Sequence, residues 1–436
     1  MAGRSLSQIN VEPRGPLKGE ITTPPDKSIS HRAIIISALA EGKSLIRNFL
    51  RAEDTLRTLE AFRQMGVDIE DKGSEIIVNG KGLNGLLEPE NPIDCGNSGT
   101  TMRLLSGVLA GQPFEARLTG DSSLQRRPMQ RIIEPLSKMG AEILSEQGEY
   151  PPLTIIGGNL KAEDLTLLIA SAQVKSAILL AGLYCEGVTS VTGPARSRDH
   201  TERMLKAAGV KVETAGQKVS VTGIARLKPM DITVPGDFSS AAFFIVAGLL
   251  VPDSDILIKN VGINHTRSGL LYILKKMGAD IKTDNERVVS EEHVADIHVK
   301  HSKLKGVTAG DDFGNEILIS AIDEFPILCV AAALADGKTK ITGAKELRVK
   351  ESDRIASMSN ELGKMGVKTK ELEDGIIIEG TKSLKAAEVE SHGDHRIAMA
   401  MVVAGLLARG KTTVKDTECI NTSFPGFFSE LEKLMK

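Results

Sequence analysis

The chain of 436 residues contains no tryptophan, and aromatic residues make up only 3% of it. Its formal net charge is −3, so it has no excess of basic residues with which to neutralise a phosphate backbone. The scarcity of aromatic side chains and the lack of basic excess argue against a nucleic-acid partner. The longest apolar runs, such as residues 241–251, are too short to span a bilayer, so we expect no membrane segment.

Cysteine is scarce as well. The four cysteines (Cys95, Cys185, Cys329 and Cys419) are scattered and show neither metal-ligand spacing nor a disulfide pattern. Residues 1–20 lack the apolar core of a signal peptide. We therefore expect free thiols in a protein of the reducing cytoplasm, without a metal site. The length and an ordinary composition, 41% hydrophobic and 25% charged, predict two or three globular domains.

What the sequence does contain is a stretch, residues 25–42, in which charged and polar residues precede an apolar run. Asp26 or Ser28 can cap a helix here, and Lys27 and Arg32 flank its start. A helix N-terminus beside two cations is an anion site. In a single segment, a solvated first turn over a buried helix is the simpler interpretation. Recurrence of the pattern along the chain favours the anion site instead.

The pattern occurs six times. Each copy predicts a buried apolar helix, a strand, an amphipathic helix and then two strands, and a glycine after the second helix can close it. The copies begin at residues 27, 97, 171, 237, 323 and 394. Six copies of one supersecondary unit indicate a repeat architecture rather than unrelated domains.

The sixth copy lacks its final strands, whereas residues 17–23 form a strand with no place in any copy. We expect this N-terminal strand to complete the last copies. Residues 1–24 and 236–436 would then form one lobe, and residues 25–235 the other. A cleft between two such lobes is the expected ligand site.

The starts of the six buried helices concentrate hydrogen-bond donors and charges. They are Lys27-Ser28, Asn97-Ser98-Gly99-Thr100, Ser171-Ala172-Gln173, Ser239-Ser240, Asp323 and Asp394-His395-Arg396. Three loops add arginines, within residues 125–128, 196–200 and 347–354. Helix dipoles and unpaired N–H groups directed at one ligand, with these cations, favour a polyanion.

In the last of these loops, Lys350 and Arg354 would lie on one face of a helix, where like charges repel. Either Glu351 and Asp353 neutralise the two cations, or the cations hold an anion. We favour the anion, because the other copies also gather cations at this point.

One local motif is misleading. Residues 405–412 match the phosphate-loop pattern GxxxxGK[ST]. That loop requires a strand before it and a helix after it, whereas here the predicted helix comes first and the strand second. We therefore interpret it as a turn from helix to strand, not a nucleotide site.

Seven segments of the chain resemble the enolpyruvyl transferases, and among them the branch that acts on shikimate 3-phosphate. The matching segments are DKSISHR (26–32), GNSGTTMRLL (96–105), LQRRPM (124–129), SAQVKSA (171–177), SRDHTERML (197–205), LRVKESDR (347–354) and DHRIAMA (394–400). The resemblance implies an α/β (α+β) fold, a two-lobed inside-out barrel of six βαβαββ repeats with three in each lobe. It also implies that the enolpyruvyl group of phosphoenolpyruvate is transferred to the 5-hydroxyl of shikimate 3-phosphate, by addition and elimination. Phosphate would be released, without metal or organic cofactor.

The resemblance also implies roles for individual residues. The expected contacts to shikimate 3-phosphate are Lys27, Ser28, Arg32, Ser171, Ala172, Gln173, Arg198, Asp323 and Lys350. The expected contacts to phosphoenolpyruvate are Lys27, Gly99, Arg127, Gln173, Arg354, His395 and Arg396. Attack by the hydroxyl requires a base, for which Asp323 is suited, and protonation of C3 requires an acid such as Glu351 or Lys27.

Departures from the family pattern are few. Thr422 stands where some members carry a lysine that binds phosphoenolpyruvate, Leu104 replaces a proline and Glu346 an asparagine. These features are similar to the second of the family's two broad sequence groups. We expect small-molecule substrates and a monomer.

Two other functions fit part of the pattern. The branch that modifies a UDP-sugar typically carries a reactive cysteine in the loop before the Arg-Pro pair, and residues 120–127 contain none. An anion-binding scaffold without catalysis would explain the cations. It would not explain Asp323 and Glu351 among them, because acids weaken anion binding.

Overall fold

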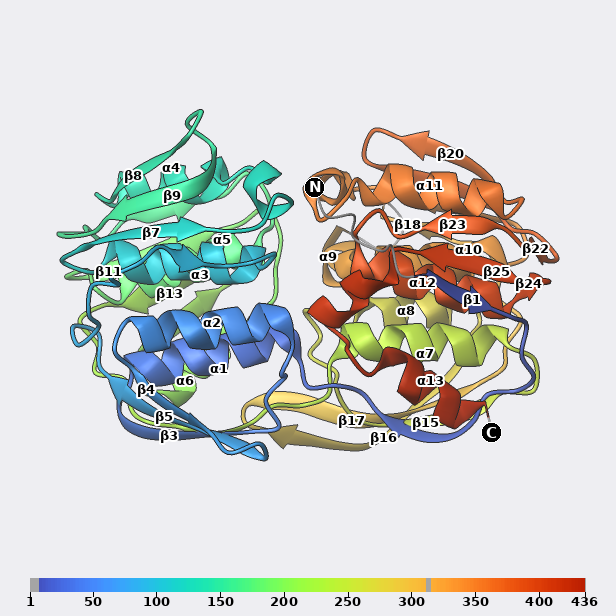
Figure 1. Ribbon diagram of the computed structural model, residues 1–436, viewed down its shortest axis with the longest axis horizontal. Coiled ribbons are helices and arrows are strands. Elements are labelled where there is room, and N and C mark those ends of the chain that lie inside the picture. The colour runs from blue at the N-terminus through green and yellow to red at the C-terminus, as the bar shows by residue number, and fades with distance from the viewer. Residues whose placement is uncertain (1–7, 311–314, 436) are drawn as a thin grey trace. The chain divides into compact units, whose positions relative to one another are not determined.

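The structure is a computed structural model that describes residues 8–310 and 315–435. Within them the chain divides into two compact units, and each is described by itself (Figure 1). Unit 1 comprises the described residues of Met1–Pro24, Pro235–Val288 and His293–Lys436. Unit 2 comprises Pro25–Val234 and Val289–Glu292. Among the residues described, no helix has the length and apolar character needed to cross a bilayer.

Unit 2 is built around three helices whose side chains are almost all buried. They are α1 (Lys27–Leu39), α3 (Gly99–Ala110) and α5 (Ala172–Gly182). Gly107 allows α3 and α5 to approach closely, because a Cβ there would lie 2.2 Å from the carbonyl oxygen of Ala177. Three further helices bury one face only: α2 (Glu53–Gln64), α4 (Gln130–Lys138) and α6 (His200–Ala207). The interior of the unit is therefore helical.

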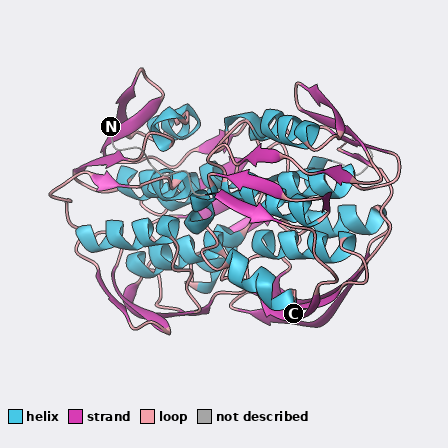
Figure 2. Cartoon of the chain, turned by 45° about the vertical axis from the view of Figure 1, so that its right-hand side comes forward, coloured by secondary structure: helices cyan, strands magenta, loops and turns pink. Residues whose placement is uncertain are grey.

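Three four-stranded sheets accompany the helices of unit 2, and strands and helices are distinguished by colour in Figure 2. The first is β14 (Asp231–Thr233), β3 (Glu41–Arg47), β5 (Glu75–Lys81) and β4 (Asp68–Asp71). The second is β6 (Ile93–Asp94), β7 (Glu115–Thr119), β9 (Tyr150–Ile156) and β8 (Glu142–Glu146). The third is β10 (Asp164–Thr166), β11 (Val188–Thr192), β13 (Lys218–Thr222) and β12 (Val212–Ala215). In each sheet the first pair is parallel and the others are antiparallel, which gives the βαβαββ repeat.

Unit 1 repeats this plan. Its buried helices are α7 (Phe238–Leu250), α10 (Phe325–Ala333) and α12 (His395–Leu406). Its other helices are α8 (Gly269–Lys276), α9 (Asn315–Ser320), α11 (Arg354–Lys364) and α13 (Phe427–Leu434). Short 3₁₀-helices in the two units are η1 (Leu124–Arg126), η2 (Ile322–Glu324), η3 (Lys345–Val349) and η4 (Thr417–Thr422). The predicted α/β class is confirmed.

The sheets of unit 1 are less regular. Two have four strands: β16 (Asp280–Val289), β17 (Glu292–Lys300), β15 (Asp255–Gly262) and β2 (Lys18–Thr22), then β18 (Thr308–Ala309), β19 (Lys338–Ile341), β21 (Gly375–Glu379) and β20 (Lys368–Leu372). The smaller sheets are β1 (Gln8–Val11), β25 (Thr412–Lys415) and β23 (Glu388–Glu390), and the pair β22 (Leu384–Lys385) and β24 (Ala408–Arg409). The segment that matched the phosphate-loop pattern runs from the end of α12 into β24 and β25, so it is a turn from helix to strand as expected.

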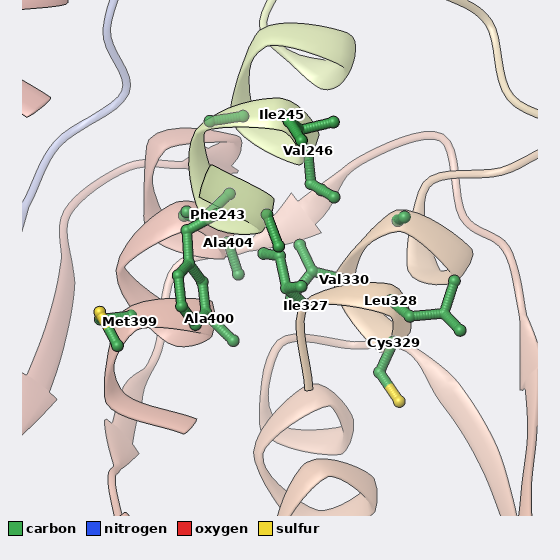
Figure 3. Packing of buried hydrophobic residues seen from close by; sticks show 14 of the residues in the cluster. Phe243, Ile245, Val246, Ile327, Leu328, Cys329, Val330, Met399, Ala400 and Ala404 are labelled. Atoms are coloured by element: carbon green, nitrogen blue, oxygen red, sulfur yellow. The ribbon is translucent and has the colours of Figure 1, made fainter. Parts of the chain in front are cut away.

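The core of unit 1 forms where α7, α10 and α12 meet. Figure 3 shows side chains of the three helices directed toward one another, among them Phe243 of α7, Ile327 and Val330 of α10, and Ala400 of α12. Alanines along α10 and α12 let the helices pack closely, and the larger side chains fill the remaining space. Every residue of these three helices is buried. Because each of the three helices is buried along its whole length, packing also holds its first turn in place.

The N-terminal strand completes one of the last three copies, as expected, but a further strand at the N-terminus was not expected. β2 pairs in parallel with β15 in copy four, over Lys18–Asp255 to Thr22–Lys259. The sixth copy is completed by β1, which pairs antiparallel with β25. In unit 2 the corresponding parallel strand of copy one is β14, which comes from residues just before the chain leaves that unit. The last strand before the chain passes from one unit to the other thus completes a sheet of the unit that the chain leaves.

A second difference concerns the hairpin of β16 and β17. Its strands belong to unit 1, but its tip, Val289–Glu292, belongs to unit 2. There the carboxylate of Glu292 lies 2.7 Å from Nδ1 of His200, and both side chains are buried. The carbonyl oxygen of Glu291 accepts a hydrogen bond from Arg203. These four residues of the hairpin therefore belong to unit 2, and Glu292 among them is buried there.

Candidate active site

In unit 2 the helix starts lie where the sequence predicted them. Asp26 caps α1, and its side chain accepts a hydrogen bond from the amide of Ile29. The ammonium of Lys27 lies 3.0 Å from the carboxylate of Asp54 at the start of α2. Ser28 lies beside it, half-buried. Asp54 was not among the predicted site residues, and it fixes the direction in which Lys27 extends.

The guanidinium of Arg32 is buried and joins three elements. It donates hydrogen bonds to Oγ1 of Thr201 in α6 (2.7 Å), Oγ of Ser176 in α5 (2.8 Å) and the carbonyl oxygen of Ser28 (3.0 Å). The predicted shikimate 3-phosphate contacts of copies one and three are therefore connected through Arg32. Arg198 lies half-buried in the loop that precedes α6.

A second group in unit 2 gathers around Gly99. The side chain of Gln173 accepts a hydrogen bond from Arg103 (2.7 Å) and donates one to Oγ1 of Thr100 (2.9 Å). A Cβ on Gly99 would lie 2.7 Å from Arg103 and 3.3 Å from Arg127, so both guanidinium groups border this glycine. Gly99, Arg127 and Gln173, which we expected to contact phosphoenolpyruvate, thus lie around one group of arginines. Arg103 was missed, because in the sequence it reads as one more residue of a buried helix.

In unit 1 the centre of the cluster is Arg354, the first residue of α11. Its side chain is 1% exposed and lies 2.7 Å from Asp394, 2.7 Å from Glu351 and 3.4 Å from Asp323. Burial alone would lower the pKa of Arg354, but the carboxylates of Asp394, Glu351 and Asp323 outweigh burial and raise this pKa. One permanently charged arginine therefore holds three acids, two of which are the predicted catalytic residues.

Arg396 extends the same cluster. It donates a hydrogen bond to the carbonyl oxygen of Asp323 at 3.1 Å, and it lies 3.8 Å from the Asp323 carboxylate and 3.6 Å from that of Glu324. Asp394 caps α12 by accepting from the amide of Arg396. His395 is buried at the first position of that helix. The predicted residues of copies five and six are therefore neighbours.

The interpretation of Lys350 requires a correction. Lys350 follows η3 and Arg354 begins α11, so the two cations do not lie on one helix. Lys350 pairs with Glu346 at 2.8 Å, and Asp353 caps α11 and pairs with Arg348. The acids that neutralise the two cations thus include Glu346 and Asp394, which sequence reasoning did not assign. Thr422 ends η4, and its hydroxyl bonds to the carbonyl of Cys419.

The sequence did not predict which side chains contact the predicted site residues. Asp54, Arg103, Glu324, Glu346 and Asp394 each contact a predicted residue. Arg103 and Asp394 lay within segments already singled out and Glu346 had been named, but no spacing rule connects any of the five to its partner. Among the described residues there is no group of three or more His, Cys, Asp or Glu side chains that could hold a metal ion.

Comparison with known proteins gives one consistent result. Residues 11–431 match the family described as EPSP synthase (3-phosphoshikimate 1-carboxyvinyltransferase). A protein of that name from Geobacter metallireducens is 54% identical over 430 residues, which cover 98% of this chain and 99% of the relative. One from Thermodesulfovibrio yellowstonii is 56% identical over 424 residues, 96% and 98% of the two chains.

Solved structures agree with the sequences. The structure of EPSP synthase from Acinetobacter baumannii superposes with a TM-score of 0.86 at 49% identity and covers 98% of both chains. The enolpyruvyl transferase NikO from Streptomyces tendae has a TM-score of 0.78 at 18% identity, over 98% of this chain and 97% of that one, which is a likeness of fold.

Proposed function

The chain belongs to the EPSP synthase family, and from this premise we propose how its residues share the chemistry. Like these relatives it is an enzyme of the shikimate pathway of aromatic amino acid biosynthesis, a transferase that moves a carboxyvinyl group to 3-phosphoshikimate. Its substrates are small molecules. The carboxyvinyl donor is phosphoenolpyruvate, and the acceptor is the 5-hydroxyl of shikimate 3-phosphate. Addition across the double bond and loss of phosphate complete the transfer.

The observation that carries this assignment of roles is the contact of Arg354 with Asp323 and Glu351. A buried arginine with a planar fork of donors holds two carboxylates in a defined direction. Asp323 is the base that takes the proton of the attacking hydroxyl. Glu351 lies in the path by which C3 of phosphoenolpyruvate gains a proton.

The cations bind the phosphates and the carboxylate. Arg127, Arg354, Arg396 and His395 serve phosphoenolpyruvate, with Gly99 leaving space beside Arg127 and Gln173 contributing an amide. Lys27 contacts both substrates and is the second candidate for the acid. Charge-assisted hydrogen bonds from a planar guanidinium suit a carboxylate or a phosphate.

The remaining contacts belong to shikimate 3-phosphate. Ser171, Ala172 and Gln173 offer the first turn of α5, and Ser28, Arg32 and Arg198 add donors and charge. Asp323 and Lys350 bind the hydroxyls of the ring. The pairing of Lys350 with Glu346 at 2.8 Å supports this role, because it leaves the ammonium at a fixed position with its other protons available.

The chain works as a monomer in the cytoplasm. This proposal is supported by the four cysteines, which are free thiols, and by exposed large apolar side chains that are spread along the chain from Leu56 to Val349. Light scattering during gel filtration tests it, and a mass of two chains would contradict it.

The experiment that tests the function is release of inorganic phosphate when the purified chain is mixed with shikimate 3-phosphate and phosphoenolpyruvate. Each substrate alone and a UDP-sugar with phosphoenolpyruvate are the controls. Phosphate should appear only with the first pair. Release with the UDP-sugar, or none with either, would contradict the function.

A further inference from the structure

Lys175 is a buried cation in the second turn of α5, and none of the roles above uses it. Its amide donates to the carbonyl of Ser171, so it lies one turn beyond the first residues of the proposed shikimate 3-phosphate site. Its residue is 8% exposed. A lysine at this depth requires partners, because a buried charge is costly when it is alone.

The ammonium has two partners. Nζ lies 2.5 Å from Oε1 of Glu202 in α6, and it donates a hydrogen bond of 3.1 Å to the carbonyl oxygen of Ser197. Ser197 is in the loop between β11 and α6, immediately before Arg198. Lys175 therefore connects the helix that carries Ser171, Ala172 and Gln173 to the backbone beside Arg198.

The neighbouring residue makes a similar but shorter connection. Oγ of Ser176 shares a hydrogen bond of 2.7 Å with Oγ1 of Thr201, and Arg32 donates to both hydroxyls. This contact fastens the first turn of α6 to α5 but does not reach the loop. Lys175 alone of these two adjacent residues bonds to the loop backbone.

Stability by itself explains the ion pair poorly. Apolar side chains of similar volume often replace a buried ion pair with equal or greater stability. In the described part of the chain, Oε2 of Glu202 is buried without a hydrogen-bond partner, which is a further cost. An ion pair that stabilises the fold little, but whose lysine bonds to one backbone carbonyl, is better explained if it positions the segment that carries this carbonyl.

We propose that Lys175 is a positioning residue for shikimate 3-phosphate binding: through the carbonyl of Ser197 it holds the segment that carries Arg198 against α5. The carboxylate of Glu202, 2.5 Å away, balances the charge of the buried ammonium. The inference rests on the proposed role of Arg198 as a phosphate ligand. It assigns the two residues no contact with substrate.

The test compares binding of shikimate 3-phosphate, measured by calorimetry without phosphoenolpyruvate, in wild type, Lys175→Met, the double variant Lys175→Met/Glu202→Leu, and Glu202→Gln. The double variant removes the buried charges together, so it should fold with a melting temperature near that of wild type. We expect its dissociation constant for shikimate 3-phosphate to rise about tenfold, as when the displaced Arg198 loses one charge-assisted hydrogen bond to the phosphate. Phosphoenolpyruvate KM and kcat should change less than about threefold.

Glu202→Gln retains the lysine and its bond to Ser197, so affinity should stay within about twofold of wild type. The matched control is Lys218→Met, which breaks a lysine–carboxylate pair with Asp164 elsewhere in the same repeat and should leave both substrates unaffected. If neither methionine variant folds, Lys175→Gln/Glu202→Gln withdraws the cation while keeping a hydrogen-bonded pair, and the same tenfold rise is expected. Unchanged shikimate 3-phosphate affinity in whichever of these variants folds, or a kcat loss with affinity intact, overturns the proposal.

A failure of this inference is distinguishable from a failure of the function. Wild-type phosphate release tests the function, whereas the variants test only how affinity for one substrate depends on Lys175.

Discussion

At the scale of single residues, Arg354 determines how its acidic neighbours can act. Its pKa is raised by three carboxylates despite its burial, so the arginine is charged and donates hydrogen bonds to these groups. A carboxylate held by a cation suits the base proposed for Asp323. For Glu351 the same contact creates a conflict, because delivery of a proton to C3 requires the acid form or a relay through Lys27.

The variant Glu351→Gln tests whether Glu351 takes part in proton transfer. If Glu351 is in the proton path, the amide keeps the shape of the site and both substrates bind as in wild type, but turnover falls about a hundredfold or more. Rates and dissociation constants are measured on one preparation, with Glu346→Gln as a control for loss of a nearby acid. Near-normal turnover, with affinity increased because an acid has been removed, would exclude Glu351 from the mechanism.

A second prediction at this scale concerns Arg127. Its guanidinium borders Gly99 and donates to Asn97 at 2.8 Å, so its position is fixed. Arg127→Ala should weaken phosphoenolpyruvate binding about ten- to a hundredfold, since a charged hydrogen bond contributes roughly 1.5–3 kcal/mol. Shikimate 3-phosphate binding should change little. Equal loss for both substrates in binding titrations would show that Arg127 has a different role.

At the scale of elements, an ion pair helps to hold the loop before α12. His392 lies 2.8 Å from the buried carboxylate of Glu361 in α11, and two residues later Asp394 caps α12 and contacts Arg354. The hydrogen bond to Glu361 raises the pKa of His392. A raised folded pKa means that the stabilisation is fully present below the unfolded value of about 6.5 and is lost as pH rises through the folded value.

The melting temperature of unit 1 should therefore fall between pH 6 and pH 9 more in wild type than in His392→Gln. At pH 6 the variant should melt on the order of 2 °C lower, as expected for an ion pair near the surface, and the difference should shrink at pH 9. Thermal unfolding in matched buffers measures both. A difference that is the same at both pH values would mean that His392 is not charged in the folded protein.

Elements differed in how well the sequence predicted them. The buried helices were recognisable because they are apolar on every side, and the repeat followed from them. β1 was missed because only Val11 of its four residues is buried and its partner β25 is some four hundred residues away. In the site, residue types and helix starts were predicted, whereas partners such as Asp54 and Glu324 depend on packing between distant segments. The tip of the β16–β17 hairpin, Val289–Glu292, has no sequence pattern that indicates its place in unit 2.

At the scale of the whole molecule, the two units have separate hydrophobic cores. Separate cores can unfold in separate steps, so scanning calorimetry should resolve two transitions. A single transition whose calorimetric and van't Hoff enthalpies agree would contradict this.

The hairpin tip allows the two transitions to be assigned. Glu292→Ala removes the buried partner of His200, at a cost of about 1–3 kcal/mol, and should lower mainly the transition of unit 2. His392→Gln should move the other one. If Glu292→Ala lowers both transitions equally, the tip stabilises the two units together.

The pairing of β2 with β15 has a consequence for synthesis on the ribosome. The partners lie 237 residues apart, as for Leu17 and Ser254 at the end of the pair. At ordinary rates of translation the first strand therefore waits about 10 to 50 seconds for its neighbour. During that time all of residues 25–234 emerge and can fold, while the N-terminal segment stays an unpaired edge. We therefore expect residues 25–234 of unit 2 to fold first, and residues 18–22 to need protection as an unpaired strand until unit 1 forms around them.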